Sequence, residues 1–291
     1  ANAPSITGTM TAYGLALLSN NQSYTLNNAS NAISSLAADI GTGSLSFTTT
    51  SVLNIGTYNS VTGITAASVT LSAGGLTDTS DAGITVTSSS TLAITNATGS
   101  YDFSGVIAGP LALTKSGAGS QTLSAANTYT GLTTISGGTL KLGVAGTSTN
   151  TPLGTAAAGT TISAGGTLDL NGYTLGTSEA LTINGYGVGN NGALINSSTT
   201  TAATYTGVIT VASASYIGGA GTMTLSGAVG GNSVAFVNGG SYTLSNSGNT
   251  ITTLATSGIG SLSLKNNAGL TIGTVNAISG MTFTGDVLLD V

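Results

Sequence analysis

The sequence contains no cysteine, histidine, tryptophan or arginine, and its only cations are Lys115, Lys141 and Lys265. Charged residues make up 4% of the chain, against about 25% in ordinary globular proteins. With a formal net charge of −5, the chain has no basic surface for nucleic acid or for an anionic membrane. We therefore expect no nucleic-acid partner.

Long apolar runs are also missing. No run approaches the roughly 20 residues of a membrane-spanning helix, and no basic and apolar leader is present. The first residues, ANAPS, lack an initiating methionine, which indicates a mature, trimmed or excised chain. The absence of cysteine is compatible with export, because stray thiols are a hazard in oxidising compartments.

Glycine (45 residues), serine, threonine and asparagine are abundant, and 40% of the residues are hydrophobic. A composition rich in glycine and small polar residues usually indicates a linker or a disordered segment. In this chain, however, valine, isoleucine and leucine recur at alternating positions throughout. Because that pattern can bury apolar surface, we expect a folded protein.

Short alternating segments bounded by glycine or asparagine, such as GGTLKLG and GGTLDLNG, indicate strands with one buried face. A register slip by one residue would bury the intervening charges, at a cost of several kcal/mol each. The predicted interior positions are Leu140, Leu142, Leu168, Leu170, Leu262, Leu264, Leu270 and Ile272, and the predicted exterior positions are Lys141, Asp169 and Lys265.

These strand patterns, with little helical periodicity, predict an all-β chain. A sandwich or a barrel does not explain why similar short segments continue for nearly the whole chain. A β-solenoid does, because each coil covers the apolar face of the previous one. At roughly 20 to 25 residues per coil, residues 1–291 would form one continuous solenoid of about a dozen coils. At about 4.8 Å per coil, the rod would be roughly 60 Å long.

The two ends of the chain share an internal repeat. SYTLNNASNAISSLA at residues 23–37 returns as SYTLSNSGNTITTLA at residues 241–255, and GSLSF and LNIGT return as GSLSL and LTIGT. The repeat spans residues 8–71 and 221–289, and we expect both copies to adopt the same coil geometry. Repetition of this kind is typical of a piece of a longer array, so we also expect axial continuation through further repeats or copies.

The segment LALTKSGAGSQTLSAANTYTGLTTISGGTLKLG, at residues 111–143, resembles the passenger-associated transport repeat, also called the autotransporter-associated β-strand repeat, of Gram-negative surface proteins. With its flanks, the repeat-like segment covers about residues 105–172. The duplicated ends resemble the repeats of filamentous-haemagglutinin-like exoproteins. The matching features are Leu113-Thr114-Lys115, Gly117, Gly119, Leu123-Ser124, Asn127 to Gly131, Thr133-Thr134-Ile135 and Gly138-Thr139-Leu140.

This resemblance implies a right-handed parallel β-helix that crosses the outer membrane through a translocator and is displayed on the cell surface or released. In such proteins the repeat serves secretion and stalk formation. The family provides no catalytic residues to carry over, and we expect an extracellular or outer-membrane-surface location.

Two short motifs have a functional and a structural interpretation. Gly187, Gly189 and Gly192 match G-x-G-x-x-G, but a dinucleotide site also needs a following helix and an acid, so we expect a corner turn. Asp78 and Asp81 could share a cation with backbone carbonyls, although a turn with two solvated acids is the expected structure.

Carboxylates are the only acid or base groups of the usual catalytic types, and only one is a glutamate. Polysaccharide-cleaving β-helices combine several acids with basic residues, whereas this chain has no arginine and no histidine. We expect no enzymatic activity and no catalytic, metal-binding or cofactor-binding residues. The tyrosines could form sugar-stacking platforms, but we expect them at coil edges with their hydroxyls in water: Tyr101, Tyr129, Tyr173, Tyr186, Tyr205 and Tyr242.

The leading hypothesis is a structural solenoid segment of a secreted bacterial surface fibre or adhesin, with self-association or axial continuation. The alternative is a carbohydrate-binding or ice-binding module, with surface glycans or ice as the partner. Ice binding requires threonine at regular coil spacing, whereas TTT at 48, TTI at 133 and TTT at 199 are unevenly placed. A β-helical hydrolase or lyase is the third hypothesis.

Overall fold

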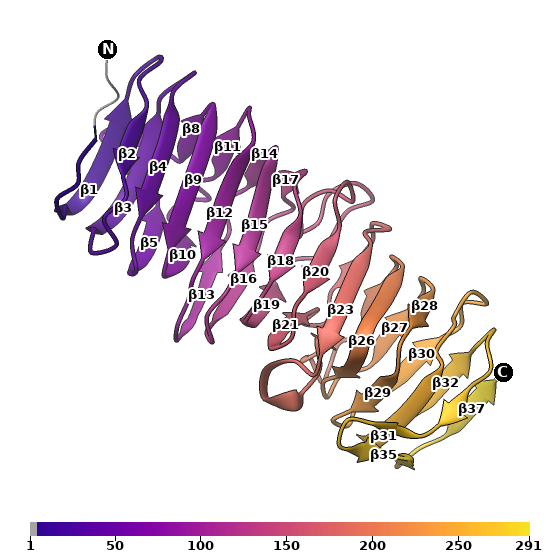
Figure 1. Cartoon of the computed structure of the whole chain (residues 1–291). Coiled ribbons are helices and arrows are strands. Elements are labelled where there is room, and N and C mark those ends of the chain that lie inside the picture. Colours follow the sequence, from indigo (N-terminus) through magenta and orange to yellow (C-terminus); the bar gives the residue numbers. More distant parts are fainter. Residues whose placement is uncertain (1–4) are drawn as a thin grey trace.

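In the computed structural model, which describes residues 5–291, parallel strands stack into a β-solenoid of about 13 turns. In Figure 1 the colour advances along the long axis from indigo to yellow, so coils that follow one another in sequence are neighbours in space. Residues 5–291 contain no α-helix, and a single 3-10 turn, η1, spans Val188–Asn190. None of these residues belongs to a helix that is long and apolar enough to cross a membrane. The predicted all-β solenoid is confirmed.

Two ladders of parallel strands run along most of the axis and share the long strand β26 (Ile209–Gly218). The first ladder consists of β2 (Tyr24–Leu26), β4 (Ser44–Thr48), β9 (Ser68–Ala73), β12 (Ser90–Ile94), β15 (Leu111–Lys115), β18 (Thr133–Ile135), β20 (Thr160–Ile162), β23 (Leu181–Gly185), β26 and β28 (Val229–Gly231). The second consists of β13 (Ser100–Phe103), β16 (Ser120–Leu123), β19 (Gly138–Leu142), β21 (Gly166–Asp169), β24 (Leu194–Ile195), β26, β29 (Val234–Val237), β31 (Thr253–Ile259), β33 (Thr271–Ile272) and β36 (Met281–Phe283).

Shorter ladders complete the coils at the two ends. The N-terminal ladder consists of β1 (Thr11–Leu18), β3 (Ala32–Asp39), β5 (Val52–Ile55), β8 (Ile64–Ala66), β10 (Gly75–Asp78), β11 (Ile84–Val86), β14 (Ile107–Gly109) and β17 (Thr128–Tyr129). The C-terminal ladder consists of β22 (Thr174–Leu175), β25 (Ala203–Tyr205), β27 (Met223–Leu225), β30 (Tyr242–Leu244), β32 (Leu262–Lys265) and β37 (Val287–Asp290). Antiparallel hairpins join β6 (Thr57–Tyr58) to β7 (Val61–Thr62) and β34 (Thr274–Val275) to β35 (Ile278–Ser279).

The core is a stack of aliphatic rows inside the coils, because alternate side chains of every ladder strand point inward. Leu140 of β19, for example, stands in register with Leu168 of β21, and both are fully buried. The predicted interior positions Leu142, Leu170, Leu262 and Leu264 are buried as well. Lys265 is exposed and Lys141 is partly exposed, as predicted.

Two predicted positions near the C-terminal end are less buried than expected. Ile272 is 45% exposed and Leu270 is half-buried, so the prediction of an interior Ile272 was wrong. The equivalent residue in the first repeat, Ile55, is fully buried because its strand pairs with β3 on one side and with β10 on the other. The strand that contains Ile272, β33, pairs only with β31.

Asp169 is buried, which corrects the prediction of an exterior position. It does stand in the outward row, in register with Lys141 and Ile195. The segment after β24 covers it, however, and the Ser197 N–H donates to its Oδ1 at 3.0 Å. The Asn171 N–H donates to the same oxygen, and Lys141 Nζ lies 3.6 Å from Oδ2. The carboxylate is therefore outside the aliphatic core but shielded from solvent.

Buried asparagines tie neighbouring coils together at the corners. The Met10 N–H donates to Asn31 Oδ1 at 2.9 Å, and Asn31 Nδ2 donates to the carbonyls of Leu26 and Thr48. One amide thereby supplies partners to three backbone groups that the turn would otherwise leave unsatisfied. Its backbone partners come from three coils.

Asn249 makes the matching contacts in the second repeat. The Val229 N–H donates to its Oδ1 at 2.8 Å, and its Nδ2 donates to the carbonyls of Leu244 and Lys265. The hairpins match too: a hydrogen bond joins the hydroxyls of residues 57 and 62 at 2.8 Å, and another joins those of residues 274 and 279 at 2.9 Å. Residues 8–71 and 221–289 share these local contacts.

Candidate functional site

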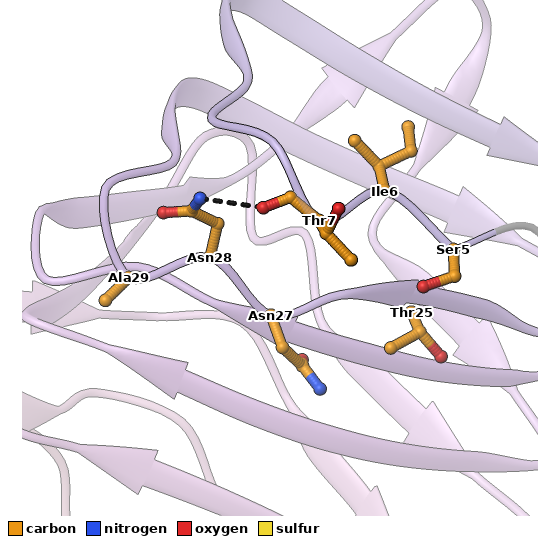
Figure 2. A pocket seen from close by; sticks show the side chains of 7 residues that line it. All are labelled: Ser5, Ile6, Thr7, Thr25, Asn27, Asn28 and Ala29. Atoms are coloured by element: carbon orange, nitrogen blue, oxygen red, sulfur yellow. Dashed lines mark hydrogen bonds between the residues drawn. The ribbon is translucent and has the colours of Figure 1, made fainter.

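A shallow hollow of about 390 Å³ lies beside the N-terminal coil (Figure 2). One hydrogen bond crosses it, from Asn28 Nδ2 to the Thr7 carbonyl at 3.0 Å. No ionisable side chain lines the hollow, so its walls supply neither an acid nor a base. The lining residues are Ser5, Ile6, Thr7, Thr25, Asn27, Asn28 and Ala29.

Asp78 and Asp81 converge on one hydroxyl group. Ser104 Oγ lies 2.9 Å from Asp78 Oδ2 and 3.0 Å from Asp81 Oδ1, and the Ser104 N–H donates to Asp78 Oδ1. A hydroxyl carries a single proton, so it donates to only one of the two carboxylates at a time. Within residues 5–291, no three histidine, cysteine, aspartate or glutamate side chains gather as metal ligands would. The structure shows the predicted turn, with Ser80 and Asp81 in the left-handed region.

The glycine motif at residues 187–192 forms a turn, as predicted. Gly187 (φ 73°) and Gly189 (φ 61°) adopt left-handed angles around η1, and the strand β24 follows. A dinucleotide site requires a helix at this point, whose N-terminus would meet the pyrophosphate. The turn leads into another coil of the solenoid.

Glu179 is a buried carboxyl group that the sequence analysis did not single out. It lies between β22 and β23, has no exposed surface, and accepts a hydrogen bond at Oε1 from Thr160 Oγ1 at 2.5 Å. Its Oε2 has no hydrogen-bond partner. Burial raises the pKa of Glu179 to about 7, and the bond from Thr160 opposes that shift.

Two buried tyrosines belong to the same polar cluster. Tyr205 Oη donates to the Glu179 carbonyl at 3.0 Å, and Tyr129 Oη shares a 2.7 Å hydrogen bond with Thr133 Oγ1. Burial raises the pKa of both phenols, and the charge of Glu179 adds to the effect. Tyr242 is buried as well, and its hydroxyl donates to the Val237 carbonyl. The prediction that these three tyrosine hydroxyls lie in water was therefore wrong.

Strand alternation could have located Glu179. Leu181 points inward, and Glu179 lies two residues earlier, where the same face of the chain continues. The group is isolated from other titratable carboxylates and sealed from solvent. It can bind and release a proton, but it has no acidic or basic partner positioned for substrate chemistry.

Lys115, the last residue of β15, is also fully buried. Its Nζ donates to the carbonyls of Ser116 at 2.7 Å, Gly117 at 3.0 Å and Gly137 at 3.2 Å. These carbonyls belong to two successive coils, so the ammonium group closes the corner between them. Burial lowers the pKa of Lys115 to about 8. The alternation in LALTK places this residue on the same face as two leucines.

Comparison with known families identifies the segment that contains Lys115. Residues 113–142 match the passenger-associated-transport-repeat. The match extends from β15 to β19 and confirms the resemblance seen in the sequence. Searches of curated proteins and of solved structures found no match. The chain therefore contains one passenger-associated transport repeat within a longer β-solenoid.

Proposed function

We propose that this chain is a structural segment of an autotransporter-type passenger, in which stacked coils form an extended surface stalk. The observation that carries the proposal is the uninterrupted stacking of parallel strands over about 13 turns, with the passenger-associated repeat in register among them. The passenger would cross the outer membrane of a Gram-negative bacterium through a translocator and act outside the cell.

The C-terminal end face supports axial continuation. Phe283 is 46% exposed, whereas the equivalent Ala66 in the first repeat is buried beneath β11. Leu289 is half-buried, whereas the equivalent Leu71 is buried beneath β12. A further coil of the kind seen in residues 75–94 would cover this face. We propose that a continuing repeat or another copy supplies it.

A mechanical role also agrees with the chemistry of the ionisable groups. Glu179 and Lys115 are sealed in the core, and Asp78 and Asp81 share a hydroxyl with no basic residue beside them. We therefore propose that the chain is not an enzyme and needs no cofactor. Its surface could still contact glycans or other cells.

An export experiment tests the proposal. The 291-residue chain would replace the corresponding stretch of an autotransporter passenger in a Gram-negative host, and added protease would report its exposure on the cell surface. We expect a surface-exposed, protease-resistant chain. Lys115→Glu should reduce the surface amount at least several-fold, because a carboxylate would face three carbonyls.

Thr85→Ala is the matched control, because Thr85 is an exposed strand residue outside the transport repeat. It should leave export unchanged. If the unmodified chain remained in the periplasm while the parent passenger reached the surface, the proposal would be wrong.

A further inference from the structure

One outer face of the first ladder has a column of threonines. Strand pairing places Thr114, Thr134, Thr161, Thr182 and Thr210 side by side on five successive coils. Their spacing in the sequence is uneven, but the loops between strands absorb the differences. Of the three threonine segments noted in the sequence, only TTI at 133 contributes to this column, through Thr134, so the regular array could not be read from those segments.

The columns on either side of the threonines are uncharged. Two residues before each threonine lies a small or apolar residue, and two residues after it lies, on four of the five coils, a small polar residue. We call the three columns together the threonine face. It contains no charged and no aromatic side chain. The apolar column consists of Ala112, Leu132, Gly159, Ala180 and Val208. The polar column consists of Ser116, Ser136, Ser163 and Asn184, and Ala212 takes the corresponding position after Thr210.

The hydroxyls of the five threonines make no hydrogen bond to any of residues 5–291. Threonines elsewhere behave differently: Thr95 Oγ1 donates to the Ala73 carbonyl at 3.2 Å, and Thr206 Oγ1 donates to the Thr177 carbonyl at 2.6 Å. The column therefore presents one free hydroxyl and one methyl group per coil. All five threonines are half-buried or exposed, so solvent reaches them.

We propose that the threonine face binds ice. Neighbouring coils of a parallel sheet are about 4.8 Å apart, so the five hydroxyls span roughly 19 Å at nearly constant spacing. That spacing is close to an oxygen repeat of the ice lattice. The hydroxyls can anchor ordered waters, while the methyl groups and the apolar column hold water in cages. An ionic group would orient water differently, and none is present.

Ice explains this face better than a glycan does. A sugar ring usually gains affinity by stacking its apolar side on an aromatic ring, and the threonine face has no such ring. Its exposed large apolar residues are Leu132 and Val208, at 41% and 54% exposure. The proposal goes beyond the stalk function, because a stalk with this face would adhere to ice.

Adsorption of the 291-residue chain to a slowly growing ice surface tests the proposal, with thermal hysteresis as a second readout. We expect the unmodified chain to be enriched in the ice fraction. Thr161→Tyr, at the centre of the column, should lower that enrichment at least tenfold because the ring holds the lattice away. Thr182→Lys should do the same. Circular dichroism would show that both variants retain strand structure.

Thr85→Tyr is the control, because Thr85 is an exposed strand residue on the N-terminal ladder, away from the threonine face. It should leave ice adsorption unchanged. The proposal would be overturned if the unmodified chain adsorbed no better than Thr161→Tyr. Retention on insoluble cellulose or chitin that Thr161→Tyr abolished, without ice adsorption, would assign the face to a glycan and would also overturn it.

Discussion

At the residue scale, two buried ionisable groups govern how stability responds to pH. Glu179 has a folded-state pKa of about 7, above its ordinary value of 4.5. Lys115 has a folded-state pKa of about 8, below its ordinary value of 10.5. In both cases burial disfavours the charged form. Near neutral pH both groups exert their largest destabilising effect, so stability should pass through a minimum there.

We predict that the free energy of unfolding falls between pH 4.5 and pH 7. Over this range the unfolded chain releases the proton of Glu179 while the folded chain keeps it, so a rise in pH favours unfolding. The expected fall is roughly 3 kcal/mol. Glu179→Gln should remove most of it in denaturant titrations at a series of pH values.

Lys115→Met is the control for that measurement and should retain the fall below pH 7. For Lys115 the sign is opposite: between pH 8 and 10.5 the unfolded chain binds more protons, so stability rises with pH. Lys115→Met should lack this rise. If the free energy of unfolding of Glu179→Gln depended on pH in the same way as that of the unmodified chain does, the fall below pH 7 could not be assigned to Glu179.

At the element scale, corner asparagines and inward leucines perform different tasks. Leucine rows stabilise the coils through burial, without selecting particular partners. Asn31 and Asn249 each bond one backbone N–H and two carbonyls. They thereby fix how one coil stands on the next. Both repeats use the same arrangement, although they lie at opposite ends of the molecule.

We predict that Asn249→Ala lowers the free energy of unfolding by about 2–4 kcal/mol, because three backbone groups lose their partner in a buried corner. Asn31→Ala should have a similar effect. Thr224→Ala, at a half-buried outward position whose hydroxyl makes no hydrogen bond to residues 5–291, should change stability by less than about 0.5 kcal/mol. Denaturant midpoints would measure all three. Equal effects of Asn249→Ala and Thr224→Ala would contradict the corner role.

At the scale of the whole molecule, the two ends of the rod differ from its middle. Apolar side chains are exposed at the C-terminal end, where β33, β36 and β37 each pair with one neighbour only. Phe283 is 46% exposed there, and Leu289 is half-buried. Strand edges of this kind favour pairing with another strand. The C-terminal end face is therefore the expected site of an axial contact.

We predict that Leu289→Lys weakens self-association of the chain at least tenfold, because Leu289 stands in register with the buried Leu264 and a charge would enter the apolar end face. Sedimentation at a series of concentrations would measure the change. Val188→Lys is the control, since Val188 is 38% exposed in the η1 turn at the side of the rod. Equal effects of the two substitutions would contradict an axial contact through the end face.

Much of the fold and little of the candidate sites could be predicted from the sequence. Alternation with a period of two correctly placed Leu140 and Leu168 inside, because a strand has only two faces. The same rule puts Glu179 and Lys115 on the inward face. They were nevertheless not predicted as core residues, because ionisable side chains are rarely buried. Glu179 accepts its hydrogen bond from Thr160 on another coil, and Lys115 donates to Gly137 on the next coil as well as to its own neighbours. Local patterning does not specify the contacts between coils.

The sequence by itself determined the all-β class, the stacked coils and the inward leucine rows, because strand alternation and glycine-rich turns are local properties. The tertiary structure alone decided which positions are covered. The segment after β24 shields Asp169. Ile55 is covered by β10, whereas no strand of residues 5–291 covers Ile272 in the same way. It also aligned Thr114 with Thr210, because loops of unequal length return the chain to the same register on every coil.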